Sequence, residues 1–412
     1  MLDTVSAKTV MQRCTMLGSY SEEDGQLTRR FATPMMSKAN DVVSAWMQAT
    51  GMSVRRDAVG NLIGRYEATS AGAKTLLLGS HLDTVRNAGM YDGPLGVLVA
   101  LACIERLHTR RERLPFALEI IAFADEEGLR YHYAYIGSKA TTGTFDTVAL
   151  DLTDTDGISM RDAILAFGGN PDALHRVNWQ AEELVGYCEV HIEQGPVLEA
   201  HHLPIGIVSA ITGHNRAVVS FEGQAGHAGT VPMQLRHDAL CAAAEFTLAA
   251  ETLARAYPGA VATVGQLEVQ PGASNVIPGR VTLSLDVRHQ DDTLREAVYQ
   301  QLQRQAQDIC AKREVTFQWQ AIQETHSVQC DPQLISLLER AIQETNYPLL
   351  VLPSGAGHDG VPMSHLTSVA MLFVRCRGGV SHHPAESVNE EDVAVAVEVL
   401  ERFLHLLAQK VM

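Results

Sequence analysis

A histidine and an aspartate stand where an apolar segment ends, in "SHLDT" (80–84), directly after "TLLLG". His81 and Asp83 are two residues apart, so their side chains point to the same side of an extended chain. A carboxylate beside a histidine commonly fixes the tautomer of a metal-binding imidazole. Asp92 follows in "GMYDGPLG", at the entry to a predicted helix. The pattern indicates a metal site, but each residue has an ordinary alternative: a hydrogen-bonded structural histidine, or a helix N-cap at Asp92.

Three adjacent carboxylates, Asp125, Glu126 and Glu127, follow another apolar segment, "LEIIAFA" (118–124). Such a run is either a solvated turn or a group that holds a positive ion and moves protons. The spacing alone does not separate the roles of the two glutamates.

Further histidines recur after apolar segments: His191 in "EVHIEQGP", and His382 and His383 in "GGVSHHPAES". The seven cysteines are scattered and form no CxxC motif, so a thiolate zinc site is not expected. Histidine and carboxylate ligands suit zinc, manganese, cobalt or nickel, and the sequence does not choose among these metals. The spacing leaves both His382 and His383 open as ligands.

The elements that must position these residues alternate between helix and strand over the first 200 residues. The patterns predict a strand–turn–strand at 53–67, buried strands at 74–85 and 116–124, and helices at 39–51 and 93–110. Continuous apolar strands between helices are typical of an α/β domain with a mostly parallel sheet flanked by helices. Ligands gather beyond the carboxyl ends of such strands, which is where the histidines and carboxylates fall.

The pattern changes at about residue 212 and changes back at about residue 328. Between them, the predicted order is β-α-β-β-α-β, typical of a ferredoxin-like α+β unit: 216–223, 237–257, 261–269, 279–289, 293–313 and 314–322. The sequence therefore predicts a discontinuous catalytic domain, 1–211 with 328–412, and an inserted second domain, 212–327.

The composition is that of a globular protein, with 46% hydrophobic and 19% charged residues. The net charge of −16 argues against a nucleic-acid partner, because phosphate binding needs clustered Lys and Arg. The start of the chain does not resemble a signal peptide, and the densest apolar stretch, 96–104, is too short to cross a bilayer. With the scattered cysteines, these features predict a cytoplasmic protein that does not bind membranes.

Nine motifs together resemble the dinuclear-metal amidohydrolases of the M20 peptidase clan, from about residue 60 to the C-terminus. They are "GSHLDTV", "YDGPLGV", "ADEEG", "HIEQGPVLE", "GQAGHAGTVPM", "SNVIPG", "DVRH", "SGAGHDG" and "GGVSHHPAES". Within the clan they are similar to the ureide branch, the allantoate amidohydrolases and N-carbamoyl-L-amino-acid hydrolases. The resemblance implies a metallopeptidase-like domain with an inserted lid and dimerisation domain, a homodimer, and two divalent metal ions (Zn, Mn, Co or Ni) per subunit.

The resemblance also implies a role for each motif residue. Asp92 would bridge two metals, with His81 and His191 completing the first site and Glu127 and His382 the second. Glu126 would be the general base, and Asp83 would support His81. Arg288 and Asn275 would bind the substrate carboxylate, and His227 would stabilise the oxyanion in the active site of the other subunit. Gln194, Gly357 and His358 would line the substrate pocket. An Asp286–Arg288 surface pair is the ordinary alternative for the arginine. Asp125 and His383 receive no role.

The implied activity is hydrolysis of a ureido C–N bond in a small acid. Allantoate, giving ureidoglycine, ammonia and carbon dioxide, is the first expectation, and an N-carbamoyl-L-amino acid is the second. A dipeptidase or aminopeptidase of the same clan is disfavoured by "HIEQG", since the peptidases usually carry an acid where His191 stands. A non-catalytic binding protein on this scaffold is disfavoured because every ligand candidate and Glu126 are present.

Overall fold

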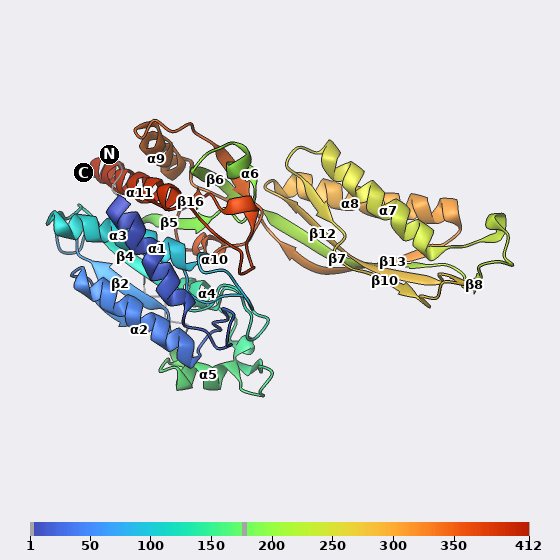
Figure 1. Cartoon of the computed structure of the whole chain (residues 1–412), viewed down its shortest axis with the longest axis horizontal. Helices are drawn as coiled ribbons and strands as arrows, with labels where there is room; N and C mark the ends of the chain where they lie inside the picture. Colours follow the sequence, from blue (N-terminus) through green and yellow to red (C-terminus); the bar gives the residue numbers. More distant parts are fainter. Residues whose placement is uncertain (1–3, 175–178, 412) are drawn as a thin grey trace. The chain divides into compact units, whose positions relative to one another are not determined.

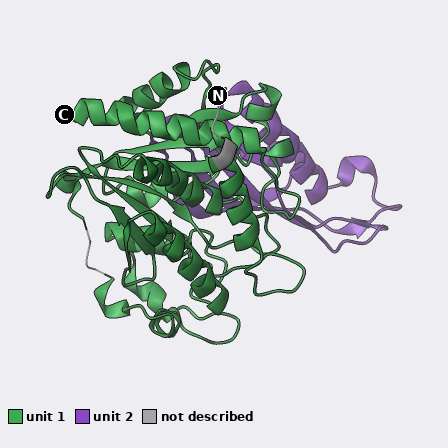
Figure 2. Cartoon of the chain, turned by 60° about the vertical axis from the view of Figure 1, so that its left-hand side comes forward, with its two compact units in different colours: residues 1–209, 330–412 green, residues 210–329 purple. Residues whose placement is uncertain are grey.

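The computed structural model describes residues 4–174 and 179–411. The chain divides into two compact units, unit 1 with residues 1–209 and 330–412, and unit 2 with residues 210–329 (Figure 2). Residues 1–3, 175–178 and 412 of the predicted catalytic domain lie outside the described residues. The role of the inserted unit as a lid and dimerisation domain stays a prediction.

The large sheet confirms the predicted α/β class. Its strand order is β1 (Ser53–Arg56), β2 (Leu62–Tyr66), β4 (Ala117–Phe123), β3 (Thr75–His81), β5 (Leu184–Ile192), β16 (Val369–Val374), β6 (Ile205–Ile211) and β14 (Val328–Gln329), while β15 (Val351–Ser354) pairs with β6. The central pairs β4-β3, β3-β5 and β5-β16 are parallel, and the flanking pairs β1-β2, β2-β4 and β16-β6 are antiparallel. The central strands are buried on both faces, which explains their unbroken apolar sequences.

Helices pack against this sheet through one hydrophobic core (Figure 1). The core joins the strands with α1 (Thr4–Gly18), α2 (Pro34–Ala49), α3 (Pro94–Thr109), α9 (Pro332–Gln343) and α11 (Glu390–Val411). A smaller cluster holds α4 (Ile136–Thr142) and α5 (Met160–Ala166), and the short α6 (Val197–Ala200) and α10 (Gly360–Met363) follow β5 and β15. Within the described residues, every helix is too short or too polar to span a bilayer.

Unit 2 has its own sheet and core. The strand order is β10 (Leu267–Gln270), β12 (Arg280–His289), β7 (Gly213–Glu222) and β13 (Thr316–Thr325), with β9 (Val261–Thr263) also on β12. The helices α7 (Ala239–Ala256) and α8 (Asp292–Arg313) cover one face of it (Figure 1). The single strand predicted at 261–269 is wrong: it is interrupted between β9 and β10, where the Gln266 N–H donates to the Ser284 hydroxyl at 3.0 Å.

Candidate metal centre

Two neighbouring parallel strands place His81 and His191 at the same edge of the sheet. β3 ends at His81, and its neighbour β5 carries His191 one residue before its end. The acidic loop 125–127 follows β4, the neighbour of β3 on the other side. The carboxyl ends of these strands therefore meet, as the sequence pattern predicts.

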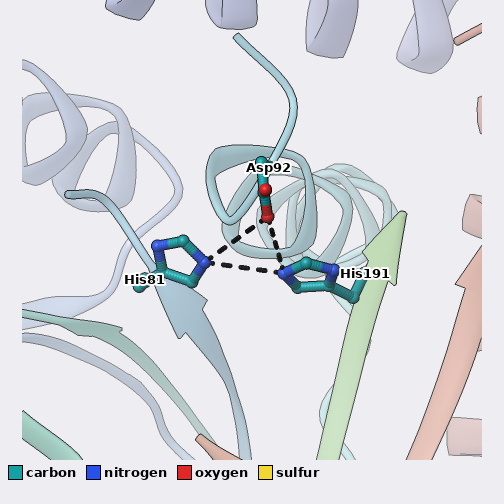
Figure 3. A group of neighbouring side chains, drawn as sticks. All are labelled: His81, Asp92 and His191. Atoms are coloured by element: carbon teal, nitrogen blue, oxygen red, sulfur yellow. Dashed lines mark hydrogen bonds and ion pairs between the residues drawn. The ribbon is translucent and has the colours of Figure 1, made fainter. Parts of the chain in front are cut away.

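His81, Asp92 and His191 form a buried group, called the inner group below (Figure 3). The Nε2 atoms of the two histidines lie 3.5 Å apart, and Asp92 Oδ1 lies 3.2 Å from His191 Nε2 and 3.7 Å from His81 Nε2. Each Nδ1 lies against a backbone carbonyl, that of Asp83 at 3.1 Å and that of Ile192 at 2.9 Å.

The inner group fits a cation. A carbonyl oxygen only accepts hydrogen bonds, so each Nδ1 carries a proton, and in a neutral ring the Nε2 atom then presents a lone pair. Two such lone pairs and a carboxylate oxygen converge in a buried space. Burial lowers the pKa of His81, but its contacts with Asp83 and Asp92 outweigh burial and raise that pKa well above its ordinary value. The site therefore attracts positive charge, and this donor set suits a divalent metal ion.

A glycine lets the Asp92 loop approach the first histidine. Gly93 has φ 85°, and a Cβ built on it would lie 2.5 Å from His81 Cε1. A side chain at this position would therefore displace the His81 ring. The "DG" pair thus combines a ligand with the space that the ligand needs.

Asp92, Glu127 and His382 form a second group, the outer group, which shares Asp92 with the first. His382 Nε2 lies 3.2 Å from Asp92 Oδ2 and 3.5 Å from Glu127 Oε1. Hydrogen bonding to Asp92 raises the pKa of His382 to about 9, and burial followed by the charge of Asp92 raises that of Glu127 to about 7. The structure brings His382 to this group, whereas exposed His383 accepts a hydrogen bond from the Ala385 N–H within its own turn.

Asp83 connects the segment that follows β3 with the acidic loop 125–127. Its carboxylate accepts the backbone N–H groups of Glu126 at 3.0 Å and Glu127 at 3.1 Å, while it also contacts His81. Glu126 groups with His81 and Glu127, but among the described residues no group joins it to Asp92 or His382. Burial, followed by the charge of Glu127, raises the pKa of Glu126 well above its ordinary value. A buried carboxyl group with a raised pKa beside other titratable side chains is a candidate for proton transfer.

Residues 77–406 match the sequence profile of peptidase family M20/M25/M40. The chain belongs to this family. This M20 chain is 40% identical to the probable allantoate deiminase of Oryza sativa subsp. japonica, over 95% of the chain and 87% of that protein. It is also 40% identical to the N-carbamoyl-L-amino acid amidohydrolase of Geobacillus stearothermophilus, over 98% of the chain and 99% of that protein.

The fold of the M20 chain is similarly close to solved structures. A hydantoinase/carbamoylase family amidase from Burkholderia multivorans superposes with a TM-score of 0.91 at 28% identity, over 98% of this chain and 97% of that one. The M20 family is metal-dependent, and the inner and outer groups are candidate metal ligands.

Sequence reasoning missed two residues that hold Asp92 in place. The Glu386 carboxylate accepts the backbone N–H groups of Tyr91 at 2.8 Å and Asp92 at 3.0 Å. The Ser381 hydroxyl donates to Asp92 Oδ2 at 2.8 Å. Both lie in the "SHHPAES" motif, of which only the histidines were predicted as candidate ligands. Predicted Gln194 donates to the same Asp92 oxygen at 3.0 Å, so it lies at the outer group.

His358, a predicted pocket residue, is buried next to His191 of the inner group. It is 1% exposed, its Nε2 lies 2.7 Å from the Ser354 hydroxyl, and its ring packs edge-on against His191 at 4.5 Å between centroids. Burial, followed by the charge of His191, lowers the pKa of His358 well below its ordinary value. Buried Glu189, which sequence reasoning missed, groups with both histidines.

Unit 2 brings together two predicted motifs. β8 (Gly226–His227) pairs with β11 (Val276–Ile277), and the Ala228 N–H donates to the Asn275 carbonyl at 2.9 Å, so His227 and Asn275 are close in the chain's fold. On β12, the Arg288 guanidinium donates to both oxygens of Asp286, each at 2.9 Å. The ion pair named as the alternative for Arg288 is therefore formed. The substrate roles of these residues stay predictions.

Proposed function

We propose that this chain is a metal-dependent amidohydrolase that cleaves the ureido C–N bond of allantoate, giving ureidoglycine, ammonia and carbon dioxide. The observation that carries the proposal is the pair of donor groups sharing Asp92, with Glu126 beside them. The proposed substrate class is supported by two relatives matched over nearly the whole chain, which are named a probable allantoate deiminase and an N-carbamoyl-L-amino acid amidohydrolase.

We propose two divalent ions, one held by His81, Asp92 and His191 and one by Asp92, Glu127 and His382. When bound, such ions would lower the pKa of a water molecule and polarise the carbonyl group of the substrate. Asp83 keeps His81 in the tautomer that exposes Nε2, and it holds the loop of Glu126 and Glu127 through two backbone hydrogen bonds.

Glu126 is the proposed general base. It takes a proton from the attacking water and returns it to the leaving nitrogen. This role requires a carboxylate that lies close to the proposed metal ligands but is not itself a ligand. Arg288 and Asn275 are the proposed partners of the substrate carboxylate, and His227 is the proposed oxyanion donor to the second subunit of a homodimer. Gln194 and Gly357 are the proposed pocket residues.

A second candidate, hydrolysis of N-carbamoyl-L-amino acids, is favoured by a specific observation. The carbamoyl amino acid hydrolase of Geobacillus stearothermophilus matches the chain at the same 40% identity as the rice protein, and over more of its own length. Both substrates carry a ureido group and a carboxylate, so the same residues would serve either.

The test is a substrate panel on purified protein reconstituted with Mn, Zn, Co or Ni, scored by ammonia release. Allantoate should be the preferred substrate. Preference for N-carbamoyl amino acids would select the second candidate, and cleavage of dipeptides without ammonia release from any ureido acid would contradict both. Light scattering after size exclusion tests the proposed dimer.

A further inference from the structure

A tyrosine precedes α4 in an unusual backbone conformation. Tyr135 has φ 65° and ψ 33°, the left-handed region that bulky side chains rarely adopt. Its backbone N–H donates to the carbonyl of Glu126 at 3.0 Å, so the strained residue is tied to the acidic loop. Such strain persists only where the surrounding structure imposes it, and it concentrates at functional sites.

The hydroxyl of Tyr135 lies against Gly357, a residue assigned to the pocket. A Cβ built on Gly357 would lie 1.9 Å from Tyr135 Oη, so only glycine leaves room for the phenol there. Burial and then the charges of Glu126, Asp359, Glu127 and Glu189 raise the pKa of Tyr135 well above its ordinary value. The phenol therefore stays protonated.

This hydroxyl is available to a ligand. Among the described residues, the Tyr135 hydroxyl makes no hydrogen bond, and the side chain is only partly buried. Tyr133, two residues earlier, differs in its hydroxyl, which accepts the Asp146 N–H at 3.4 Å. Lys139 Nζ lies near both rings, 4.0 Å from the centre of the Tyr133 ring and 5.7 Å from that of Tyr135. The hydroxyl of Tyr133 is therefore engaged by the fold, whereas that of Tyr135 is a donor on a residue whose backbone is hydrogen-bonded to the proposed base.

We propose that the Tyr135 hydroxyl donates a hydrogen bond to the carbonyl oxygen of the carbamoyl group that is hydrolysed. The inference rests on the proposed function and adds a substrate-contacting residue to it. As water adds to the carbon, the C=O electron pair moves onto the oxygen and the hydrogen bond strengthens. Tyr135 keeps its proton throughout. Because the contact is stronger in the transition state than in the bound substrate, it acts on kcat more than on KM.

The test replaces only the hydroxyl. Tyr135→Phe should lower kcat on the preferred ureido acid by about 10- to 100-fold with little change in KM, since a hydrogen bond to a developing charge is lost. Tyr133→Phe removes a hydroxyl from the same segment and should keep wild-type kcat. Metal content and thermal unfolding should match the wild type in both variants.

The outcomes separate this inference from the proposed function. Wild-type kcat in Tyr135→Phe would overturn the inference and leave the proposed function standing. Loss of metal or of stability together with turnover would assign Tyr135 a structural role and also overturn it. If the wild type cleaves dipeptides and not ureido acids, the proposed function fails, and the same comparison on the peptide carbonyl decides whether Tyr135 contacts the reacting oxygen.

Discussion

The two donor groups share one aspartate but are built differently. The inner histidines, His81 and His191, are each 2% exposed in their side chains and stand at the ends of paired parallel strands. The outer histidine, His382, is 48% exposed and belongs to a loop, where its φ is 56°. Hydrogen-bonded strands hold side chains more rigidly than a loop does.

This difference teaches that one carboxylate can couple a rigid site to an adaptable one. The inner histidines are held by backbone carbonyls at both Nδ1 atoms, whereas His382 contacts only side chains, those of Asp92, Glu127 and Gln194, among the described residues. An ion in the outer group should therefore exchange more readily than an ion in the inner group.

The largest expected effect comes from removing the shared ligand. Asp92→Ala should abolish binding at both groups and leave no measurable turnover, because the inner and outer groups each lose their common carboxylate. Elemental analysis of the purified variant measures the bound metal. Asp172→Ala, on an exposed aspartate, is the matched control. Retention of one tightly bound ion in Asp92→Ala would contradict the proposal that both donor groups depend on Asp92.

Glu126→Gln should lower kcat by about 10²- to 10⁴-fold, the usual contribution of a positioned acid–base group. Metal content should stay at the wild-type value, because Glu126 is assigned to neither ion. Steady-state ammonia release and elemental analysis give the two readings. Loss of metal in this variant would instead make Glu126 a ligand and exchange its role with that of Glu127.

The two histidine truncations compare the groups directly. His382→Ala should release the outer ion and keep the inner one, whereas His191→Ala should weaken the inner ion, and through Asp92 the outer ion as well. In the wild type, titration with a chelator should remove the ions in two steps. A single step, or equal losses in the two variants, would show that the groups do not differ in affinity.

Glu386 tests how the Asp92 loop is held. Both backbone N–H groups donate to the same atom, Oε1, so Glu386→Gln keeps an acceptor and Glu386→Ala removes it. The alanine variant should bind metal about 10- to 100-fold more weakly, as when other indirect partners of ligands are removed. The glutamine variant should stay near wild type. Equal metal affinities in the two variants would show that Glu386 does not hold the Asp92 loop in its metal-binding position.

The smallest expected effect concerns His358, which packs against His191 of the inner group and belongs to neither the inner nor the outer group. Its pKa is lowered in the folded chain, chiefly by burial, so the unfolded chain binds more protons below the ordinary pKa of 6.5. Stability from this residue is present above that pH and is lost as the pH falls, at about 1.4 kcal/mol per pH unit for one proton.

His358→Gln should remove this component, so the difference in unfolding free energy between wild type and variant should shrink from pH 7.5 to pH 5. Urea denaturation across this range provides the measurement. Exposed His202→Gln is the control. A difference that does not change with pH would show that His358 does not titrate differently on folding.

The local patterns of the sequence were sufficient for the central strands, for α2 and α3 and for most elements of unit 2, but they did not indicate α1, α4 or α5. Unbroken apolar runs predicted the central strands, and the strand predicted at 279–289 is β12, where Val281, Leu283, Leu285 and Val287 are at most 1% exposed. The family resemblance then proposed which histidines and carboxylates belong together. The interruption between β9 and β10 escaped prediction, because a side-chain hydroxyl replaces a ladder hydrogen bond there.

What the sequence determined by itself was the types of the donors and the strand ends that carry them. Only the tertiary structure decided how they combine. Glu386 reaches the Asp92 loop from nearly 300 positions away, Gly357 makes room for Tyr135, and the turn that follows His382 engages His383 with its own backbone. These relations depend on three-dimensional packing between segments distant in the chain, so periodicity and spacing do not contain them.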